Sequence, residues 1–347
     1  MAALSGFVSH LGKGLLVAGA IAAGSVIAHL APERAGAAVP RSTPSPAFVE
    51  AAPAEPSAIA GPSPAAPDAP RMRDPLGSDM ARGLIIGGAT PHRILLFTFD
   101  DGPERRTTPR LLDMLDREGI KAVFFLTTNR ILDATPRNRQ QAEIAREILR
   151  RGHAIGAHSV NHVQLPTLDD VGVAYEIDEA ARLIEREVGA RPFLVRPPGG
   201  SRSPRVDGLI AQRGYTQVLW NLGAGDFQVS TPDLVYETFF KVLERKEREE
   251  GQRGGIVLLH DTYEHTVEAF PRIVAELRRR NCELLARGEE LYDFGGDVAM
   301  FHVPRGEEDG PSAEAPPMVL PPEVLATRQA RLREENRSRC AAPAEPR

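Results

Sequence analysis

The stretch Ile94–Gly102 reads ILLFTFDDG, an apolar run that ends in two adjacent carboxylates and a glycine. The apolar part predicts a buried strand, and Asp100 and Asp101 stand where this strand runs into a turn. Many α/β enzymes keep their chemistry at strand ends. Asp and Gly are also common turn residues, so this stretch by itself fits a plain turn at least as well.

A second apolar run, Ala154–Ala157, leads into the sequence HSVNH, in which His158 and His162 are four residues apart. Two histidines at this spacing are weak support for a metal site, because core and surface histidines often share it. One Asp with two His, however, is a three-ligand set that leaves a coordination position open for water. The two stretches together therefore predict a catalytic metal site.

Three further motifs follow predicted strands. The first, RPPGG at 196–200, predicts an abrupt turn, with Arg196 at the mouth of the site orienting a carboxylate. The alternative for Arg196 is a solvated side chain at a strand-to-loop corner. Asp226 lies in the second motif, 220–227, and His260 ends the apolar run of the third, 256–261.

The five motifs resemble those of the polysaccharide deacetylases with a NodB-homology domain, carbohydrate esterase family 4, from about Arg93 to about Val303. The resemblance implies that Asp100 is the general base and His260 the general acid. The metal ligands that it implies are Asp101, His158 and His162. It also implies a set of supporting or substrate-contacting residues: Arg196, Pro198, Gly199, Asp226, Phe227 and Leu258. Among these, Leu258 would line an acetyl pocket.

Hydrolysis of an N-acetyl group requires these residue types. A divalent metal, expected to be zinc, with cobalt or another divalent ion as a substitute, makes water nucleophilic near neutral pH. The metal and a backbone N–H, expected to be that of Gly199, can stabilise the oxyanion. The amine leaves only when protonated, and a histidine such as His260 can supply that proton.

Three positions depart from the family pattern. Gly199 replaces the usual aromatic residue, Gly223 replaces an Asp, and Phe227 replaces a Trp.

The expected substrate is an N-acetylglucosamine-type glycan such as peptidoglycan, a chitin-like polymer or an exopolysaccharide. The alternatives are an O-acetyl esterase acting on xylan-like polysaccharide and a non-catalytic glycan-binding protein on the same fold. Retention of the base, the ligands and the acid favours an enzyme.

Apolar and helical stretches alternate along the chain, which predicts a parallel sheet with crossover helices. The motifs at strand ends favour an irregular (β/α) barrel of the NodB-homology type, with disordered N- and C-terminal extensions. The strands are expected at 94–99, 122–127, 154–157, 193–196, 216–220 and 256–259, and the helices near 107–118, 139–151, 169–187, 204–213, 232–248 and 264–281.

The chain of 347 residues is expected to hold one folded domain, 86–303. Residues 1–37 predict a signal peptide or an uncleaved anchor, so the protein is expected to be exported and to be periplasmic, membrane-anchored or extracellular. Residues 38–85, rich in Pro and Ala, predict a linker. The segment 304–347 predicts a disordered tail with one short helix around 323–335.

The formal net charge of −5 excludes little, but no basic stripe with interleaved aromatic residues is present. The expected partner is therefore an acetylated polysaccharide and not a nucleic acid. An oxidising compartment would allow Cys282 and Cys340 to form a disulfide, but they are expected to remain unpaired, because Cys340 falls in the predicted tail.

The remaining titratable residues near the motifs have structural interpretations. His153 is expected to satisfy local backbone groups, and Asp261 to cap the helix that follows it. His92, His265 and His302 are expected on the surface or in loops.

Overall fold

The computed structural model describes residues 83–132, 135–303 and 316–341. The predicted signal peptide or anchor, 1–37, and residues 38–82 of the predicted linker lie outside these ranges. Within the described ranges, none of the helices has the length and apolar character needed to cross a membrane.

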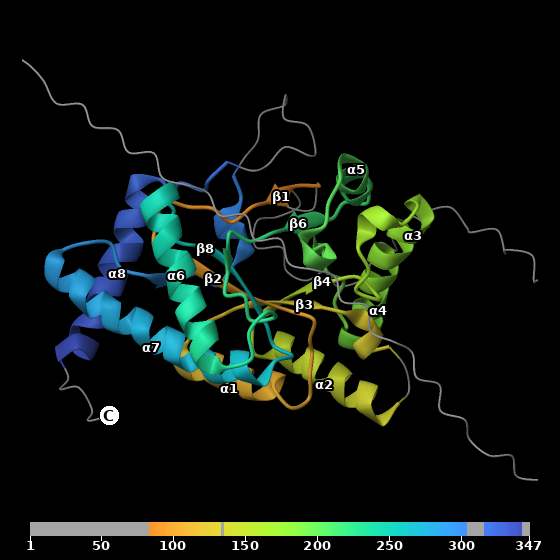
Figure 1. Ribbon diagram of the computed structural model, residues 1–347, viewed down its shortest axis with the longest axis horizontal. Coiled ribbons are helices and arrows are strands. Elements are labelled where there is room, and N and C mark those ends of the chain that lie inside the picture. The colour runs from red at the N-terminus through yellow and green to blue at the C-terminus, as the bar shows by residue number, and fades with distance from the viewer. Residues whose placement is uncertain (1–82, 133–134, 304–315, 342–347) are drawn as a thin grey trace, which may run out of the picture. The chain divides into compact units, whose positions relative to one another are not determined.

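The described strands form one parallel sheet in the order β1-β6-β5-β4-β3-β2-β8-β7, with β9 paired to the start of β2 (Figure 1). Helices surround the curled sheet, which confirms the irregular (β/α) barrel. The strands are β1 (Ile85–Ile86), β2 (Ile94–Asp100), β3 (Val123–Leu126), β4 (Ala154–Ala157), β5 (Leu194–Val195), β6 (Thr216–Val218), β7 (Leu222–Gly223), β8 (Gly255–His260) and β9 (Asp293–Phe294).

Seven α-helices of the described chain lie between strands, as crossover connections require, and an eighth follows the last strand. They are α1 (Thr108–Glu118), α2 (Pro136–Arg150), α3 (Asp170–Ala174), α4 (Ala180–Val188), α5 (Pro204–Gln212), α6 (Pro232–Glu250), α7 (Glu264–Arg287) and α8 (Pro322–Ala341). Short helical turns complete the described structure: η1 (Thr128–Arg130), η2 (Leu165–Thr167), η3 (Tyr175–Glu179, a π-helix that joins α3 to α4), η4 (Pro198–Gly200) and η5 (Val298–Phe301).

Three helices begin with the same local signal, a hydroxyl residue followed by proline. The side chains of Thr135, Ser203 and Thr231 accept hydrogen bonds from backbone N–H groups in the first turns of α2, α5 and α6. Proline at the next position has no N–H to leave unpaired and has a φ suited to the helix. These caps fix where the crossover helices start.

The side chains of β2 alternate between two hydrophobic layers, because successive residues of a strand point to opposite faces. Leu95, Phe97 and Phe99 pack in the layer that contains the crossover helices. Ile94 and Leu96 pack inside the curled sheet with residues of the other strands. Asp100 follows this second set in register, so its carboxylate belongs to the inner face.

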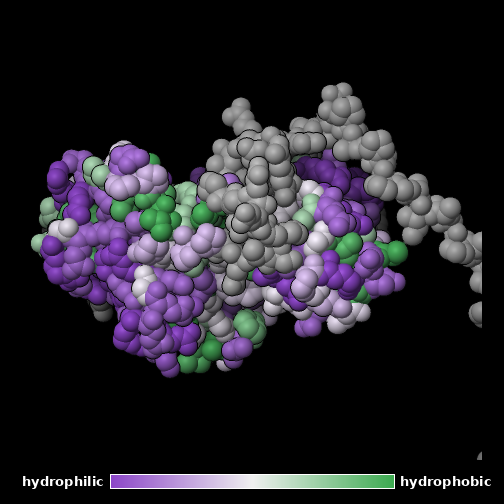
Figure 2. All heavy atoms as spheres, turned by 90° about the horizontal axis from the view of Figure 1, so that it is seen from above, coloured by the Kyte–Doolittle hydropathy of each residue, from purple (hydrophilic) through white to green (hydrophobic). Residues whose placement is uncertain are grey.

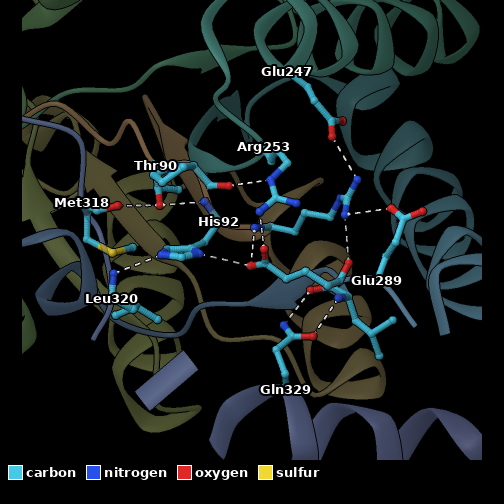
Figure 3. Close-up of polar contacts among 12 residues, drawn as sticks. Thr90, His92, Glu247, Arg253, Glu289, Met318, Leu320 and Gln329 are labelled. Carbon is cyan, nitrogen blue, oxygen red and sulfur yellow. Dashed lines mark hydrogen bonds and ion pairs between the residues drawn. The ribbon is translucent and has the colours of Figure 1, made fainter. Parts of the chain in front are cut away.

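The C-terminal segment is ordered where it is described, and the predicted disordered tail is wrong for residues 316–341. Met318 is buried in the inner layer beside Ile94 and Phe301. Thr90 Oγ1 donates to the Met318 carbonyl at 2.7 Å, and the Leu320 N–H donates to His92 Nε2 at 3.1 Å (Figure 3). His92 lies in the loop before β2, as expected, but it is buried, and its Nε2 anchors the backbone of Leu320.

Helix α8, which contains the short helix expected around 323–335, packs on α7. Gln329 forms hydrogen bonds with both the N–H and the carbonyl of Leu291 (Figure 3). Cys340 of α8 forms a disulfide with Cys282 of α7, with Cα atoms 5.5 Å apart. The expectation of unpaired cysteines is wrong, because α8 is ordered and holds Cys340 beside α7.

Figure 2 shows that one face of the molecule is mainly hydrophilic, with small, separate hydrophobic areas. The large apolar side chains that remain exposed in the described chain are few: Val171, Tyr175, Phe227, Leu234, Val319 and Val324. Phe227, with 56% exposure, is the one that belongs to a predicted site motif.

Candidate active site

The two carboxylates at the end of β2 both face the same site because the backbone turns between them. Regular alternation would send Asp100 and Asp101 to opposite faces. Asp101, however, has φ 72°, a left-handed conformation that ends the strand. As a result Asp100 Oδ2 and Asp101 Oδ1 each lie 3.6 Å from His158 Nε2.

Arg196 holds Asp100 from inside the barrel. Its Nη1 donates to Asp100 Oδ1 and to Thr98 Oγ1, both at 2.7 Å. The guanidinium carbon lies 4.1 Å from the centre of the Phe125 ring. Arg196 is fully buried, so it is not at the mouth of the site as expected, although it does orient a carboxylate.

His158 enters the site from the end of β4 with a fixed tautomer. Its Nδ1 lies 2.7 Å from the carbonyl oxygen of Arg196, so Nδ1–H donates to that oxygen and Nε2 is left with its lone pair toward the carboxylates. Burial lowers the pKa of His158, although Asp100 and Asp101 oppose this effect. Burial therefore favours the neutral imidazole that metal binding requires.

His162 reaches the same point from the loop after β4. Its Nε2 lies 3.2 Å from Asp101 Oδ1, and its side chain is 45% exposed. In the described chain, Asp101, His158 and His162 form a group whose ligand atoms all lie within 4.8 Å of one another. The site is thus buried at His158 and open to solvent at His162.

The donor set fits a divalent cation. Asp101 Oδ1 is buried and accepts no hydrogen bond from the described residues, although two imidazole nitrogens face it. A buried carboxylate oxygen without a donor is costly unless a cation compensates it. One carboxylate and two imidazoles make up a common ligand set for catalytic zinc.

His260 approaches from the end of β8, on the other side of Asp101. Its Nδ1 donates to Asp226 Oδ1 at 2.9 Å, and its Nε2 lies 4.0 Å from Asp101 Oδ2. Burial by itself lowers the pKa of His260. The hydrogen bond to Asp226 and the charges of the nearby carboxylates outweigh burial and raise this pKa to about 9. The imidazolium is therefore the dominant form at neutral pH.

Asp226 is held by groups that the sequence motifs did not reveal. The backbone N–H of His260 and the hydroxyl of Thr266 both donate to Asp226 Oδ2, at 2.7 and 2.9 Å. His265 Nε2 donates to the Asp226 carbonyl at 2.8 Å. The sequence led us to expect His265 on the surface or in a loop, but it lies in a helix and forms a hydrogen bond with Asp226. His265 and Thr266 lie in the first turn of α7, and only the fold brings them to Asp226.

Two aromatic rings flank His260. The rings of Phe227 and Tyr263 have centroids 5.8 and 5.6 Å from that of His260, in edge-on orientations. Tyr263 also stacks on His265 at 5.2 Å. Sequence reasoning selected Phe227 but missed Tyr263, which has no motif of its own.

Asp261 was expected to cap the helix that follows it, but it does not. It is fully buried and accepts a hydrogen bond of 2.5 Å from Thr108 Oγ1 of α1. Burial raises the pKa of Asp261 to about 7. It lies directly against Gly102, where an added Cβ would meet Asp261 Oδ2 at 2.2 Å.

Two other histidines lie outside the candidate site. His153 Nδ1 accepts a hydrogen bond from the Ala122 N–H, which confirms its structural role, and burial lowers its pKa to about 4. His302 follows η5 in a loop, as expected.

The remaining predicted site residues line the mouth. Leu258 lies two residues before His260 on β8, so the two share the inner face, and Leu258 is 6% exposed. Pro198 is buried, whereas Gly199 is exposed with φ 61° and open space where a side chain would stand. No aromatic wall stands at position 199.

Comparisons with known proteins relate part of this sequence to a family. Residues 87–218 match the family model described as polysaccharide deacetylase. The match includes the motifs around Asp100, His158 and Arg196 and ends before Asp226 and His260.

The curated relatives include deacetylases of two glycans. A chitin deacetylase of Arthroderma benhamiae is 29% identical over 227 residues, which are 63% of this chain and 57% of the relative. A peptidoglycan-N-acetylglucosamine deacetylase of Bacillus cereus is 29% identical over 202 residues, which are 57% of this chain and 88% of the relative.

Among solved structures, a family 4 carbohydrate esterase from Streptomyces lividans in complex with acetate is 26% identical. The similarity covers 54% of this chain and 88% of that one, with a TM-score of 0.46. On the family-model match and the curated relatives, the chain contains a domain of the polysaccharide deacetylase family, the NodB-homology domain of carbohydrate esterase family 4.

Proposed function

We propose that the protein is a metal-dependent hydrolase that removes N-acetyl groups from an N-acetylglucosamine-type glycan. The observation that carries the proposal is the group of Asp101, His158 and His162, whose ligand atoms lie within 4.8 Å of one another, with Asp100 and His260 beside it. The names of the relatives support peptidoglycan and chitin-like glycans as substrates.

In this proposal Asp101, His158 and His162 hold one divalent cation, expected to be zinc. When bound, such a cation acts as a Lewis acid and makes water nucleophilic at neutral pH. Asp100 accepts the proton of the attacking water, and Arg196 Nη1, 2.7 Å from Asp100 Oδ1, holds the carboxylate in place.

His260 supplies the second proton. Its Nδ1 is engaged by Asp226, so Nε2–H is the proton that faces the site and passes to the leaving nitrogen. The amine then departs as a neutral group, Asp100 releases the proton that it took from water to solvent, and His260 is reprotonated from solvent. Phe227, Tyr263 and Leu258 limit the access of water to His260.

Substrate binding involves the exposed groups at the mouth. The apolar ring of Phe227 suits the apolar face of a sugar, and the open space at Gly199 leaves room for a glycan that an aromatic wall would exclude. Export to the cell envelope or beyond agrees with such a substrate. The signal peptide or membrane anchor at 1–37 is a proposal from sequence alone.

Acetate release from a panel of glycans tests the proposal. The panel consists of peptidoglycan, N-acetylglucosamine oligomers and acetylated xylan, with His162→Ala as the inactive control. Release from the first two that depends on His162 is expected. Release from xylan alone would assign an O-acetyl esterase. Binding to a glycan without any release, in protein loaded with metal, would assign a glycan-binding protein.

A further inference from the structure

The two proposed histidine ligands are joined by a loop whose backbone is strained. Ser159 and His162 are both non-glycine residues with positive φ, 65° and 57°. Such conformations are unfavourable for these residues and persist only where surrounding contacts impose them. The loop between β4 and η2 therefore needs an external support to hold His162 toward Asp101.

Glu176 provides that support from a different element. Its Oε2 accepts hydrogen bonds from the N–H groups of Val160 and Asn161, both at 2.9 Å. Its Oε1 accepts a third, at 2.8 Å, from the Asn161 side chain. Glu176 is 4% exposed, and all three donors are uncharged. A buried carboxylate makes stronger hydrogen bonds than a neutral acceptor does, so this one fixes the loop firmly.

The position of Glu176 depends on an irregular helix. Glu176 lies in η3, the π-helical turn between α3 and α4. A π-turn adds a residue to the helix and changes the direction of its side chains, and such turns are frequent at functional sites. Two carbonyl groups of the same loop form hydrogen bonds that do not involve Glu176. The Thr128 N–H donates to the Ser159 carbonyl, and the Asn129 N–H donates to the Val160 carbonyl.

We propose that Glu176 is a positioning residue for the metal site, which sets the affinity for the metal by fixing the loop between His158 and His162. The inference rests on the metal site of the proposed function. Glu176 touches no ligand atom of the metal and acts only through residues 160 and 161. Groups that orient metal ligands in this way typically change metal affinity about 10–100-fold when removed.

The test is a titration of the metal-free, full-length protein with Co²⁺, followed by its visible absorption. Glu176→Ala is expected to weaken Co²⁺ binding about 10–100-fold and to alter the absorption bands, because His162 is no longer held. Glu176→Gln is expected to weaken binding less, about threefold, because an amide oxygen can still accept both backbone hydrogen bonds.

Asp293→Ala is the matched control. Asp293 is equally buried, at 3%, and pairs with Arg328, but it lies opposite Ile94 at the start of β2, far along the strand from Asp100. This variant is expected to lose thermal stability and to bind Co²⁺ like the unaltered protein. It separates a general loss of stability from a loss of ligand positioning.

Two results would overturn the inference. If Glu176→Ala binds Co²⁺ with the affinity and absorption of the unaltered protein, Glu176 has no positioning role. If Glu176→Ala does not fold, Glu176→Gln decides, and unchanged binding in that variant overturns the inference in the same way. Failure of the unaltered protein to bind Co²⁺ would instead refute the metal site of the proposed function, and this inference with it.

Discussion

Asp100 and Asp101 are neighbours with different surroundings, and this difference separates their proposed roles. Asp100 is 2% exposed and its Oδ1 is engaged by Arg196. Asp101 Oδ1 has no hydrogen-bond donor among the described residues and faces two imidazoles. The sequence predicted both residues, but not the left-handed backbone at Asp101 that turns both carboxylates to one site, because only the folded turn determines it.

Substitution of either the base or a ligand distinguishes the two roles. Asp100→Asn is expected to bind metal normally and to lose about 10²–10⁴-fold in acetate release, because the proton acceptor is absent. His162→Ala is expected to lose both metal binding and acetate release. Metal content by elemental analysis and acetate release measure the two effects. Equal metal loss in both variants would show that the carboxylates are assigned wrongly.

The pH profile tests the acid. The pKa of His260 is raised to about 9 in the fold, so His260 is protonated at neutral pH and loses its proton only as the pH rises through that value. The alkaline limb of the rate should therefore follow His260, because only the protonated imidazole can give a proton to the leaving nitrogen.

Asp226→Asn removes the charge that favours the imidazolium. The alkaline limb is expected to move to lower pH and turnover at neutral pH to fall roughly tenfold, with metal affinity nearly unchanged. Rates measured from pH 5 to pH 10 in both proteins provide the comparison. An alkaline limb that stays in place would mean that Asp226 is structural or that His260 is not the acid.

At the scale of elements, the apolar pattern predicted the larger strands and helices well. All six predicted strands and all six predicted helical stretches correspond to elements of the structure. The strands that were missed, β1, β7 and β9, have two residues each, too few to produce a periodic pattern. The π-turn that carries Glu176 was also missed, because a one-residue bulge leaves the helical pattern nearly intact.

The sequence predicted part of α8, at 323–335, but not the packing of this helix on the domain. Its buried residues are Gln329, Leu332 and Asn336, so its packed face is largely polar and gives no amphipathic signal. It is held by hydrogen bonds to Leu291 and by the disulfide to α7, which depend on the rest of the fold.

Loss of the disulfide tests the anchoring of α8. Cys340→Ser is expected to lower the free energy of unfolding by about 2–4 kcal/mol, with acetate release unchanged, because α8 contacts the end of the barrel opposite to Asp100. Thermal unfolding with and without reductant measures this. Reductant should lower the melting temperature of the unaltered protein only. A variant as stable as the unaltered protein would show that the disulfide contributes nothing.

At the scale of the whole molecule, the rim that carries the candidate site and the C-terminal segment occupy opposite ends of the barrel. Parallel strands bring the predicted motifs to one end, which is why their chemistry was readable from sequence. The other end is closed by Phe301 and Met318, which pack against Ile94. The sequence between 304 and 347 reads as a tail because only a few of its residues are apolar enough to contribute to the core.

A chain that ends at Val303 tests this closure. The sequence alone predicted that roughly 82–303 folds by itself, but removal of Met318 and α8 uncovers Ile94 and deletes the disulfide. The free energy of unfolding is expected to fall by about 4 kcal/mol, measured by denaturant unfolding. Equal stability of the shortened and complete chains would show that the C-terminal segment is dispensable.

The central claim is that one divalent metal, held by Asp101, His158 and His162, is required for deacetylation. The most direct test is acetate release from N-acetylglucosamine oligomers by the full-length protein after exhaustive chelation. The account predicts no release from the stripped protein and recovery with one equivalent of Zn²⁺ or Co²⁺, but no recovery in His162→Ala. Full activity of the metal-free protein would contradict it.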